Sequence, residues 1–175
     1  MRTLAVVSAI GALISLNGCG PVENSPGSPE GTLCFDYFQR CVYPLALEAA
    51  SPFACSAAGC HKEPGNSGGA LRITPGQAPV DLNILTAAEV RLTAIHSTFL
   101  SVKGVANINS PRLSDLLRKP LVEVSHGGGR IFVSDQDSAA RQLLFWVTNP
   151  APVGGDEFSA QCANLFAAGN LCQPF

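Results

Sequence analysis

Apolar residues recur every three or four positions along much of the chain, which is the pattern of helices that bury one face. The first such stretch, Leu33 to Leu45, predicts a helix that Pro44 interrupts or bends. Thr86 and Glu89 fit a capping box, in which each side chain accepts from a free backbone amide, at the start of a helix from about Ala87 to Val102. Both segments are expected to pack through their apolar faces.

Three more helices are expected in the second half of the chain. A serine N-cap and a proline at the first helical position, residues 110–111, predict a short helix that Pro120 ends. Apolar faces predict helices over Asp135–Thr148 and over about Phe158–Phe166, and Ala70–Ile73 is expected to be a short extended stretch. The predicted fold class is mostly α: a small single domain with long Gly/Pro-rich loops and disulfides.

The composition agrees with a compact, loop-rich protein. The chain has 175 residues, of which 17 are Gly and 13 are Pro, and 14% are charged, against roughly 25% in an average soluble protein. The formal net charge of -2 provides no basic surface, so we expect no nucleic-acid partner. Residues 19–32, rich in Pro, Gly and Ser, are expected to be a flexible tether, and residues 33–175 to form the folded domain.

The N-terminal residues have the pattern of a secretory signal, with an apolar run, Leu4–Leu16, that is too short to span a bilayer. Leu16-Asn17-Gly18-Cys19 resembles the lipobox of bacterial lipoproteins, which implies a signal peptide over 1–18 and a lipid on Cys19 that anchors the protein to a membrane. In that family Gly20 favours the outer membrane, which implies the cell envelope, on the periplasmic side. An ordinary signal peptide with a free or disulfide-bonded Cys19 is the alternative.

Seven cysteines occur, and the six that remain after Cys19 are expected to be bonded, because an exported chain meets oxidising conditions. Either all six form three disulfides, or Cys55 and Cys60 bind a cofactor and the others form two. In the second case the disulfide candidates are Cys34, Cys41, Cys162 and Cys172. Pairs of neighbours would close each end of the domain, and cross-pairs would tie the first helix to the C-terminal tail; the sequence is compatible with both.

The segment from Cys55 to His61 contains the clearest candidate chemistry. Two cysteines followed at once by a histidine can attach a haem covalently, because the thiols add to its vinyl groups and the imidazole binds the iron. The spacer has four residues instead of the usual two, so the segment must loop. The alternatives are a Cys55–Cys60 disulfide beside an exposed His61, and a metal site of the same three residues without an evident fourth ligand.

Several short motifs follow one another between Phe35 and Val147. They are a helix with Phe38, Val42 and Pro44, then Gly59-Cys60-His61, a Gly-rich loop, Ser114–Pro120, His126–Gly129 and Leu143–Val147. Their order resembles that of the small planctomycete-type cytochrome c domains. The resemblance implies a cytochrome c-like fold around one covalent haem c, with Cys60 and His61 at the haem and the late tryptophan helix packed against the early helix.

Iron held by one imidazole usually has a second axial ligand. Met1 is the only methionine and would be removed with the signal peptide, which leaves His96 and His126. We favour His126, which stands in a Gly-rich loop and falls on the histidine-glycine motif of the resembled family, over His96, which lies inside a predicted helix. The expected metal ligands are therefore His61 and His126, and an iron with one open side is the remaining alternative.

These residues predict an exported, lipid-anchored cytochrome that transfers electrons to or from a redox partner protein. It would be an electron carrier rather than an enzyme, although an open iron could act on small ligands or peroxide. Arg118, Lys119 and Arg130 could pair with the haem carboxylates, but solvated positions are favoured for all three. The alternative from a different class is a haem-free, disulfide-stapled envelope lipoprotein with a binding or structural role.

Overall fold

The computed structural model describes residues 31–48, 55–56, 60–64, 69–169 and 171–175. Regular structure in this part of the chain is helical, and it contains no strand, only isolated bridges between Lys62 and Ile73 and between Ala167 and Leu171. The prediction of a mostly helical fold is confirmed. No helix among the described residues is both long and apolar enough to cross a membrane. The expected signal peptide, Cys19 and nearly all of the tether lie outside the described residues.

The first helix begins as an α-helix and continues with wider turns. α1 (Phe35–Tyr37) leads into η1 (Phe38–Leu47), a π-helix, in which an N–H donates to the carbonyl five residues earlier. Pro44, which has no N–H to donate, lies inside η1, and the helix ends where Glu48 donates to the Tyr43 carbonyl over 2.9 Å. The chain therefore passes Pro44 in widened turns, where the sequence predicts an interruption or a bend.

The remaining helices are α2 (Ala87–Val90), α3 (Ala94–Lys103), η3 (Pro111–Leu113), α4 (Asp115–Arg118), α5 (Ser138–Thr148) and η4 (Ala160–Leu165); η3 and η4 are 3-10 helices. Thr86 and Glu89 form the predicted capping box. The single helix expected over 87–102 is wrong, because Thr93 caps a new helix by accepting from the His96 N–H over 3.3 Å. A side chain that binds the backbone thus divides the segment.

Two other helix boundaries differ from expectation for a similar reason. Before α5, Asp137 Oδ2 accepts from the Ser134 N–H over 3.2 Å and holds a turn, so the helix begins at Ser138. Between η3 and α4, the Ser114 hydroxyl accepts from the Asn107 N–H over 2.6 Å, and two short helices replace the expected one. Short polar side chains therefore decide where these helices begin.

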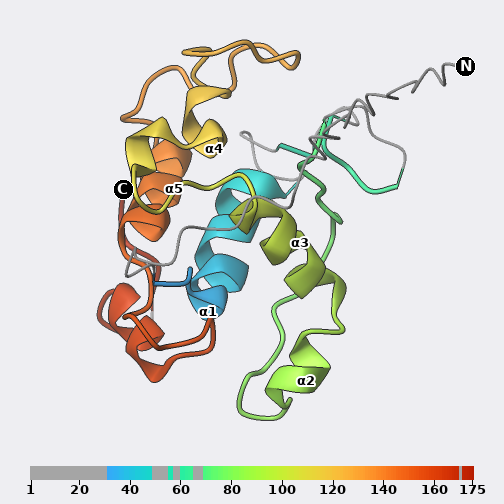
Figure 1. Ribbon diagram of the computed structural model, residues 1–175, viewed down its shortest axis with the longest axis vertical. Coiled ribbons are helices and arrows are strands. Elements are labelled where there is room, and N and C mark those ends of the chain that lie inside the picture. The colour runs from blue at the N-terminus through green and yellow to red at the C-terminus, as the bar shows by residue number, and fades with distance from the viewer. Residues whose placement is uncertain (1–30, 49–54, 57–59, 65–68, 170) are drawn as a thin grey trace, which may run out of the picture.

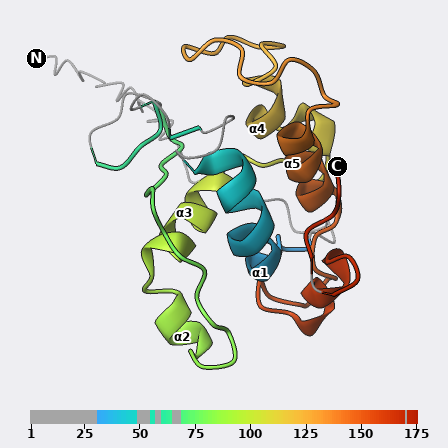
Figure 2. The ribbon, with the colours of Figure 1, turned by 180° about the vertical axis from the view of Figure 1, so that it is seen from behind.

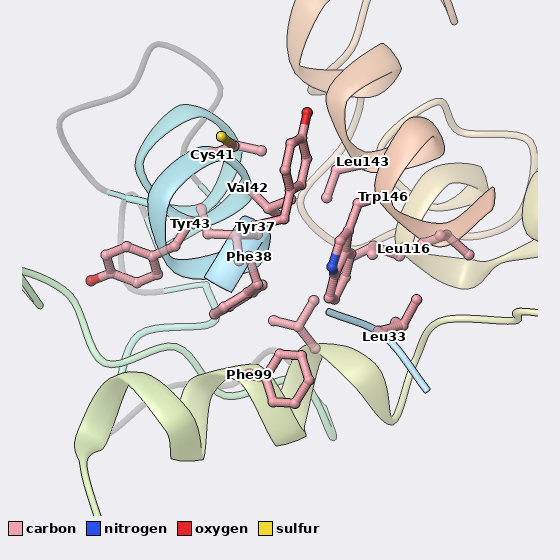
Figure 3. Close-up of a cluster of buried hydrophobic side chains, with 14 of the residues drawn as sticks. Leu33, Tyr37, Phe38, Cys41, Val42, Tyr43, Phe99, Leu116, Leu143 and Trp146 are labelled. Atoms are coloured by element: carbon pink, nitrogen blue, oxygen red, sulfur yellow. The ribbon is translucent and has the colours of Figure 1, made fainter. Parts of the chain in front are cut away.

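The core forms where η1 meets α5 and α3 (Figures 1 and 2). Figure 3 shows its aromatic centre, in which the Phe38 ring centroid lies 5.3 Å from those of both Phe99 and Trp146. The Trp146 indole is fully buried, and its Nε1–H donates to the Cys34 carbonyl over 2.9 Å. Since a buried indole N–H needs an acceptor, this bond fixes α5 against the residue that precedes α1.

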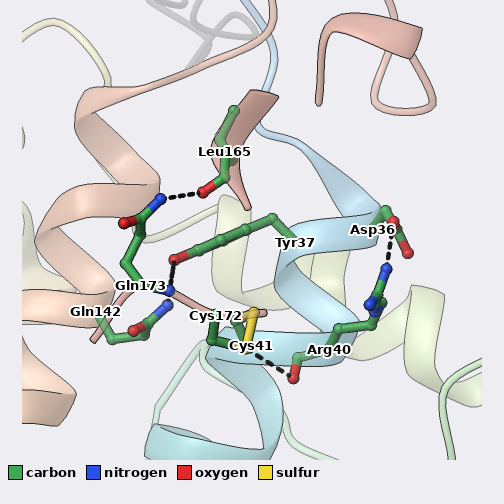
Figure 4. Close-up of a disulfide and its surroundings, with 8 residues drawn as sticks. All are labelled: Asp36, Tyr37, Arg40, Cys41, Gln142, Leu165, Cys172 and Gln173. Atoms are coloured by element: carbon green, nitrogen blue, oxygen red, sulfur yellow. Dashed lines mark hydrogen bonds and ion pairs between the residues drawn. A yellow bond between two sulfur atoms is a disulfide. The ribbon is translucent and has the colours of Figure 1, made fainter. Parts of the chain in front are cut away.

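Two disulfides tie the first helix to the C-terminal residues. Cys34 bonds to Cys162 and Cys41 to Cys172, so the cysteines are cross-paired and neighbours do not bond. Figure 4 shows the second bond beside Tyr37, whose hydroxyl accepts hydrogen bonds from α5 and from the tail. Both ends of the described chain are therefore closed onto one helix.

The two disulfides interlace: Cys41 lies inside the loop that Cys34–Cys162 closes, and Cys172 lies outside it. The contribution of each bond to stability therefore depends on whether the other bond is present. With the Cys41–Cys172 bond in place, the other closes a loop of only roughly 19 residues, those from 34 to 41 and from 162 to 172. Without it, the Cys34–Cys162 bond closes a loop that spans a sequence separation of 128. In the chain-entropy account a bond added to the other contributes about 3 kcal/mol, and a lone bond about 5 kcal/mol.

We expect Cys34→Ala/Cys162→Ala and Cys41→Ala/Cys172→Ala each to lower the free energy of unfolding by about 3 kcal/mol, and the variant without either bond by about 8 kcal/mol. Guanidinium unfolding followed by circular dichroism measures all three losses. A loss near 5 kcal/mol when only one pair is removed would contradict the interlaced account.

Candidate functional site

A cavity of about 240 Å³ lies beside α4, somewhat smaller than the ~300–1,000 Å³ of typical small-molecule sites. Its wall is mainly apolar and includes Leu71, Val105, Leu116 and Ile131. The four residues that the sequence assigns to the cofactor all line this one cavity: Cys55, Cys60, His61 and His126. The fold therefore brings together groups that lie on different segments of the chain.

Cys55 is held at the carboxyl end of η1. Its N–H donates to the Ala46 carbonyl over 3.4 Å, and the Ser56 hydroxyl donates to the Leu47 carbonyl over 2.9 Å. Because the last carbonyls of a helix have no partner within it, Cys55 and Ser56 cap η1 and are fixed by it. The spacer residues 57–59 lie outside the described residues.

His61 is fixed by the short extended stretch that the sequence predicts. The Ile73 N–H donates to the His61 carbonyl over 2.8 Å, and His61 Nδ1 lies 3.3 Å from the Leu71 carbonyl oxygen. This part of the chain is bound in turn to α3: the Ser101 hydroxyl accepts from the Arg72 N–H over 2.6 Å. The Thr98 hydroxyl accepts from the Thr74 N–H over 3.1 Å. The position of His61 therefore depends on the packing of α3 against η1.

His126 stands on a loop that leaves Pro120 and returns to it. The Pro120 carbonyl accepts from the Ile131 N–H over 2.9 Å and from the Phe132 N–H over 3.2 Å, and the Phe132 side chain is fully buried. At the tip, His126 Nδ1 lies 2.7 Å from the Gly129 carbonyl oxygen. Gly129 has a φ of 71°, which favours glycine, so this turn explains why the sequence places glycine there.

The His61 and His126 rings are nearly parallel. Their centroids lie 6.3 Å apart, and their planes are inclined by 10°. A metal ion bound to one nitrogen of each ring at about 2.0 to 2.1 Å would separate the ring centres by roughly 6 Å, since each nitrogen lies about 1 Å from its own ring centre. The observed centroid distance is therefore close to the value for a metal ion on the line between two ring nitrogens.

Hydrogen bonding leaves the same nitrogen available in both rings. A carbonyl oxygen only accepts, so the contacts with Leu71 and Gly129 require a proton on Nδ1 of both His61 and His126. In a neutral ring the lone pair is then on Nε2, which bonds to no described residue in either case. Burial lowers the pKa of His61 below its ordinary value, against the opposing hydrogen bond to Leu71, and so favours the neutral, metal-binding form.

Cys55 and Cys60 are the two described cysteines that form no disulfide. Cys55 is buried and Cys60 is partly exposed. Burial, with a further contribution from Cys60, raises the pKa of the Cys55 thiol to about 12. Because the thiolate is the reactive form, the buried Cys55 thiol is protected from oxidants.

His96, the alternative axial ligand, lies in the core and does not line the cavity. Its ring centroid is 5.3 Å from that of Phe35 and 6.0 Å from that of Phe158, and its Nε2 lies 3.4 Å from Glu157 Oε1. Burial raises the pKa of the Glu157 carboxyl. Hydrogen bonds from the Glu157 backbone, Arg91 and His96 oppose this effect, and the pKa lies below its ordinary value. The Glu157 carboxylate thus lies at Nε2 of His96, and the ring stands in the core, away from the cavity.

Within the described ranges, no three His, Cys, Asp or Glu side chains gather in a way that could hold a metal ion. The three-residue metal site of Cys55, Cys60 and His61, one of the alternatives from the sequence, therefore does not form there.

Asp115 and Gly128 also line the cavity, although the sequence does not mark them as site residues. The one available signal is the spacing of four between Asp115 and Lys119, which places both on one helix face.

Comparisons with known proteins give no match: no family model fits the chain, and no curated protein or solved structure matches it. The function therefore has to be inferred from the groups that line the cavity. These groups are two free thiols, two parallel imidazoles and an apolar wall.

Iodoacetamide distinguishes the two thiols in the protein with its disulfides intact. At about pH 8 we expect Cys60 to be alkylated first, because Cys55 is buried and its pKa of about 12 leaves almost no thiolate. The rate at Cys55 should rise about tenfold per pH unit up to about pH 10, since the thiolate fraction does so below the pKa. Peptide mass mapping measures both rates. In guanidinium the rates should converge, and equal rates in the folded protein would contradict the assignment.

Proposed function

We propose that the protein is a c-type cytochrome that holds one haem in this cavity and exchanges single electrons with a partner protein. The observation that supports this most directly is the meeting of two free thiols and two parallel imidazoles at one apolar cavity. Cys55 and Cys60 would hold the haem through thioether bonds, and Nε2 of His61 and of His126 would bind the iron. When bound, the haem would supply a centre that gains and loses one electron.

The residues present fit such a group. A thioether forms when S–H adds across a vinyl double bond, which needs no oxidant, so free thiols are the required form, and Cys55 and Cys60 are the cysteines that the disulfides leave free. The backbone carbonyls at Nδ1 of His61 and His126 orient both rings, as partners of metal-bound histidines do. The apolar wall would exclude water from the iron and help to set its potential.

The cavity also bears on how electrons would pass. Because the cavity is smaller than most ligand sites, the residues that line it would cover only part of a haem and leave the rest accessible to a redox partner. Ligation by His61 and His126 would give a lower reduction potential than ligation by histidine and methionine, other things being equal. These properties suit an electron carrier rather than an enzyme.

The proposal includes a place in the cell envelope. The lipobox-like Leu16–Cys19 and the tether lie outside the described residues; a lipid on Cys19 would hold the domain at the periplasmic side of the outer membrane. The two disulfides are consistent with an oxidising compartment. A carrier held there would meet its redox partner protein at the membrane surface.

Production together with a cytochrome c maturation system tests the proposal. The purified protein should absorb strongly in the visible range and keep its haem through denaturation, whereas Cys55→Ala/Cys60→Ala should lose the haem on denaturation. Absorbance before and after extraction with acidified solvent measures this. Colourless wild-type protein with a Cys55–Cys60 disulfide would contradict the proposal and favour the haem-free lipoprotein.

The axial ligands are tested by paired histidine variants. His126→Ala should convert low-spin, six-coordinate iron to high-spin iron, because it removes one of two strong-field ligands. His96→Gln should leave the spectrum unchanged, since His96 lies in the core beside Glu157. Absorbance and electron paramagnetic resonance report the spin state. An unchanged spectrum in His126→Ala would refute the assignment of His126.

Gly128 tests the same ligand without replacing it. A Cβ on Gly128 would lie 3.2 Å from His126 Cε1 and 3.3 Å from Nε2, whereas a Cβ on Gly127 would meet nothing within 4 Å. We therefore expect Gly128→Ala to crowd the ligating nitrogen and to produce a partly high-spin spectrum, and Gly127→Ala to match the wild type. Identical spectra from the two variants would argue against iron at Nε2 of His126.

A further inference from the structure

The cavity has little charge on its wall. Among the described residues that line it, Asp115 and Lys119 are the two with a formally charged side chain; the others are apolar, glycine, cysteine or histidine. Both lie on one face at α4, four residues apart, because Asp115 begins the helix and Lys119 caps its end. A ligand in the cavity would therefore meet an apolar surface except at this one place.

Asp115 and Lys119 form an ion pair whose two members are both accessible. Lys119 Nζ lies 3.2 Å from Asp115 Oδ2, and the side chains are 46% and 47% exposed, respectively. An ammonium group has three N–H donors, so one carboxylate partner leaves others available to a second anion. Asp115 sits close enough to repel that anion, so the two residues have opposite effects on an acidic ligand.

Other cations near the cavity are less well placed. Arg118 and Arg130 do not line it, and Arg130 Nη1 donates to the Val133 carbonyl over 3.2 Å. Arg72 Nε is paired with Glu63 Oε1 over 3.0 Å and also lies outside the lining. Among the described residues that line the cavity, Lys119 is therefore the cation available to a ligand.

We propose that Lys119 binds a carboxylate of the haem and that Asp115 weakens this contact, so that α4 determines which edge of the macrocycle lies at the mouth of the cavity. This inference rests on the proposed function, because it assumes that the ligand is haem. It adds the group that recognises the acidic side chains of the macrocycle and so gives a flat, nearly symmetrical ligand one orientation.

Iron mesoporphyrin, which has ethyl groups in place of vinyl groups and cannot form thioethers, and its dimethyl ester test the inference. Both are titrated into the protein prepared without haem, and absorbance gives the ratio of the ester's Kd to the acid's Kd. We expect Lys119→Gln to lower this ratio by about 1.5- to 5-fold, the range for half-exposed ion pairs, and Asp115→Asn to raise it by a similar factor. Arg118→Gln and Arg130→Gln are the matched controls and should leave it unchanged.

The outcomes separate this inference from the proposed function. If the wild type binds neither porphyrin, the cytochrome proposal fails. If it binds both and Lys119→Gln leaves the ratio unchanged, or if a control variant lowers the ratio as much, the cytochrome proposal stands and the role of Lys119 is refuted. Opposite shifts in Lys119→Gln and Asp115→Asn would establish that the carboxylate lies at α4.

Discussion

The attachment of the first helix to the C-terminal part of the chain determines where the rest of the described structure lies. Two disulfides and the Trp146 hydrogen bond to the Cys34 carbonyl hold α1 and η1 against α5 and the tail. Cys55 then caps η1, and α3, which packs on η1, fastens the stretch that holds His61. Groups distant in sequence therefore meet at one cavity because a single helix is fixed on several sides.

The two kinds of histidine show how surroundings decide the role of the same side chain. At His61 and His126 a backbone carbonyl occupies Nδ1 and leaves the Nε2 lone pair available. At His96 the Glu157 carboxylate lies at Nε2, and Nδ1 is buried without a partner among the described residues. The ring of His96 therefore belongs to the aromatic core, while the other two rings line a cavity.

Local signals explain most of what the sequence predicts correctly. The capping box at Thr86 and Glu89 needs only its own residues, and Cys60 and His61 are adjacent in the chain. The break at Thr93 is harder to predict, because a threonine hydroxyl can bond back to the preceding turn as well as cap, and here it does both. Disulfide pairing is harder still, since it joins residues that only the finished fold brings together.

The residues of the candidate site also differ in how well the sequence alone predicts them. Its thiols and His61 belong to one recognisable segment, whereas the parallel placement of His126 depends on a loop closed at Pro120 and on a buried Phe132. Apart from its spacing of four from Asp115, nothing local distinguishes Lys119 from its neighbour Arg118, yet Lys119 lines the cavity and Arg118 does not. The sequence thus predicts site residues where they belong to one short segment, and it predicts them poorly where only the fold brings them together.

The cross-paired disulfides also constrain the order in which the protein can mature. A ribosome delivers the chain from its N-terminus, so Cys34, Cys41, Cys55 and Cys60 all emerge well before Cys162 and Cys172. Any oxidation during that interval can only join cysteines that are not partners in the native fold, and a bond that includes Cys55 or Cys60 would consume a thiol at the cavity. Correct maturation therefore requires that oxidation wait until Cys162 and Cys172 are present, or that early disulfides be reversed by thiol exchange. The native pairing of Cys34 and Cys41 thus depends on cysteines that are made more than a hundred residues later.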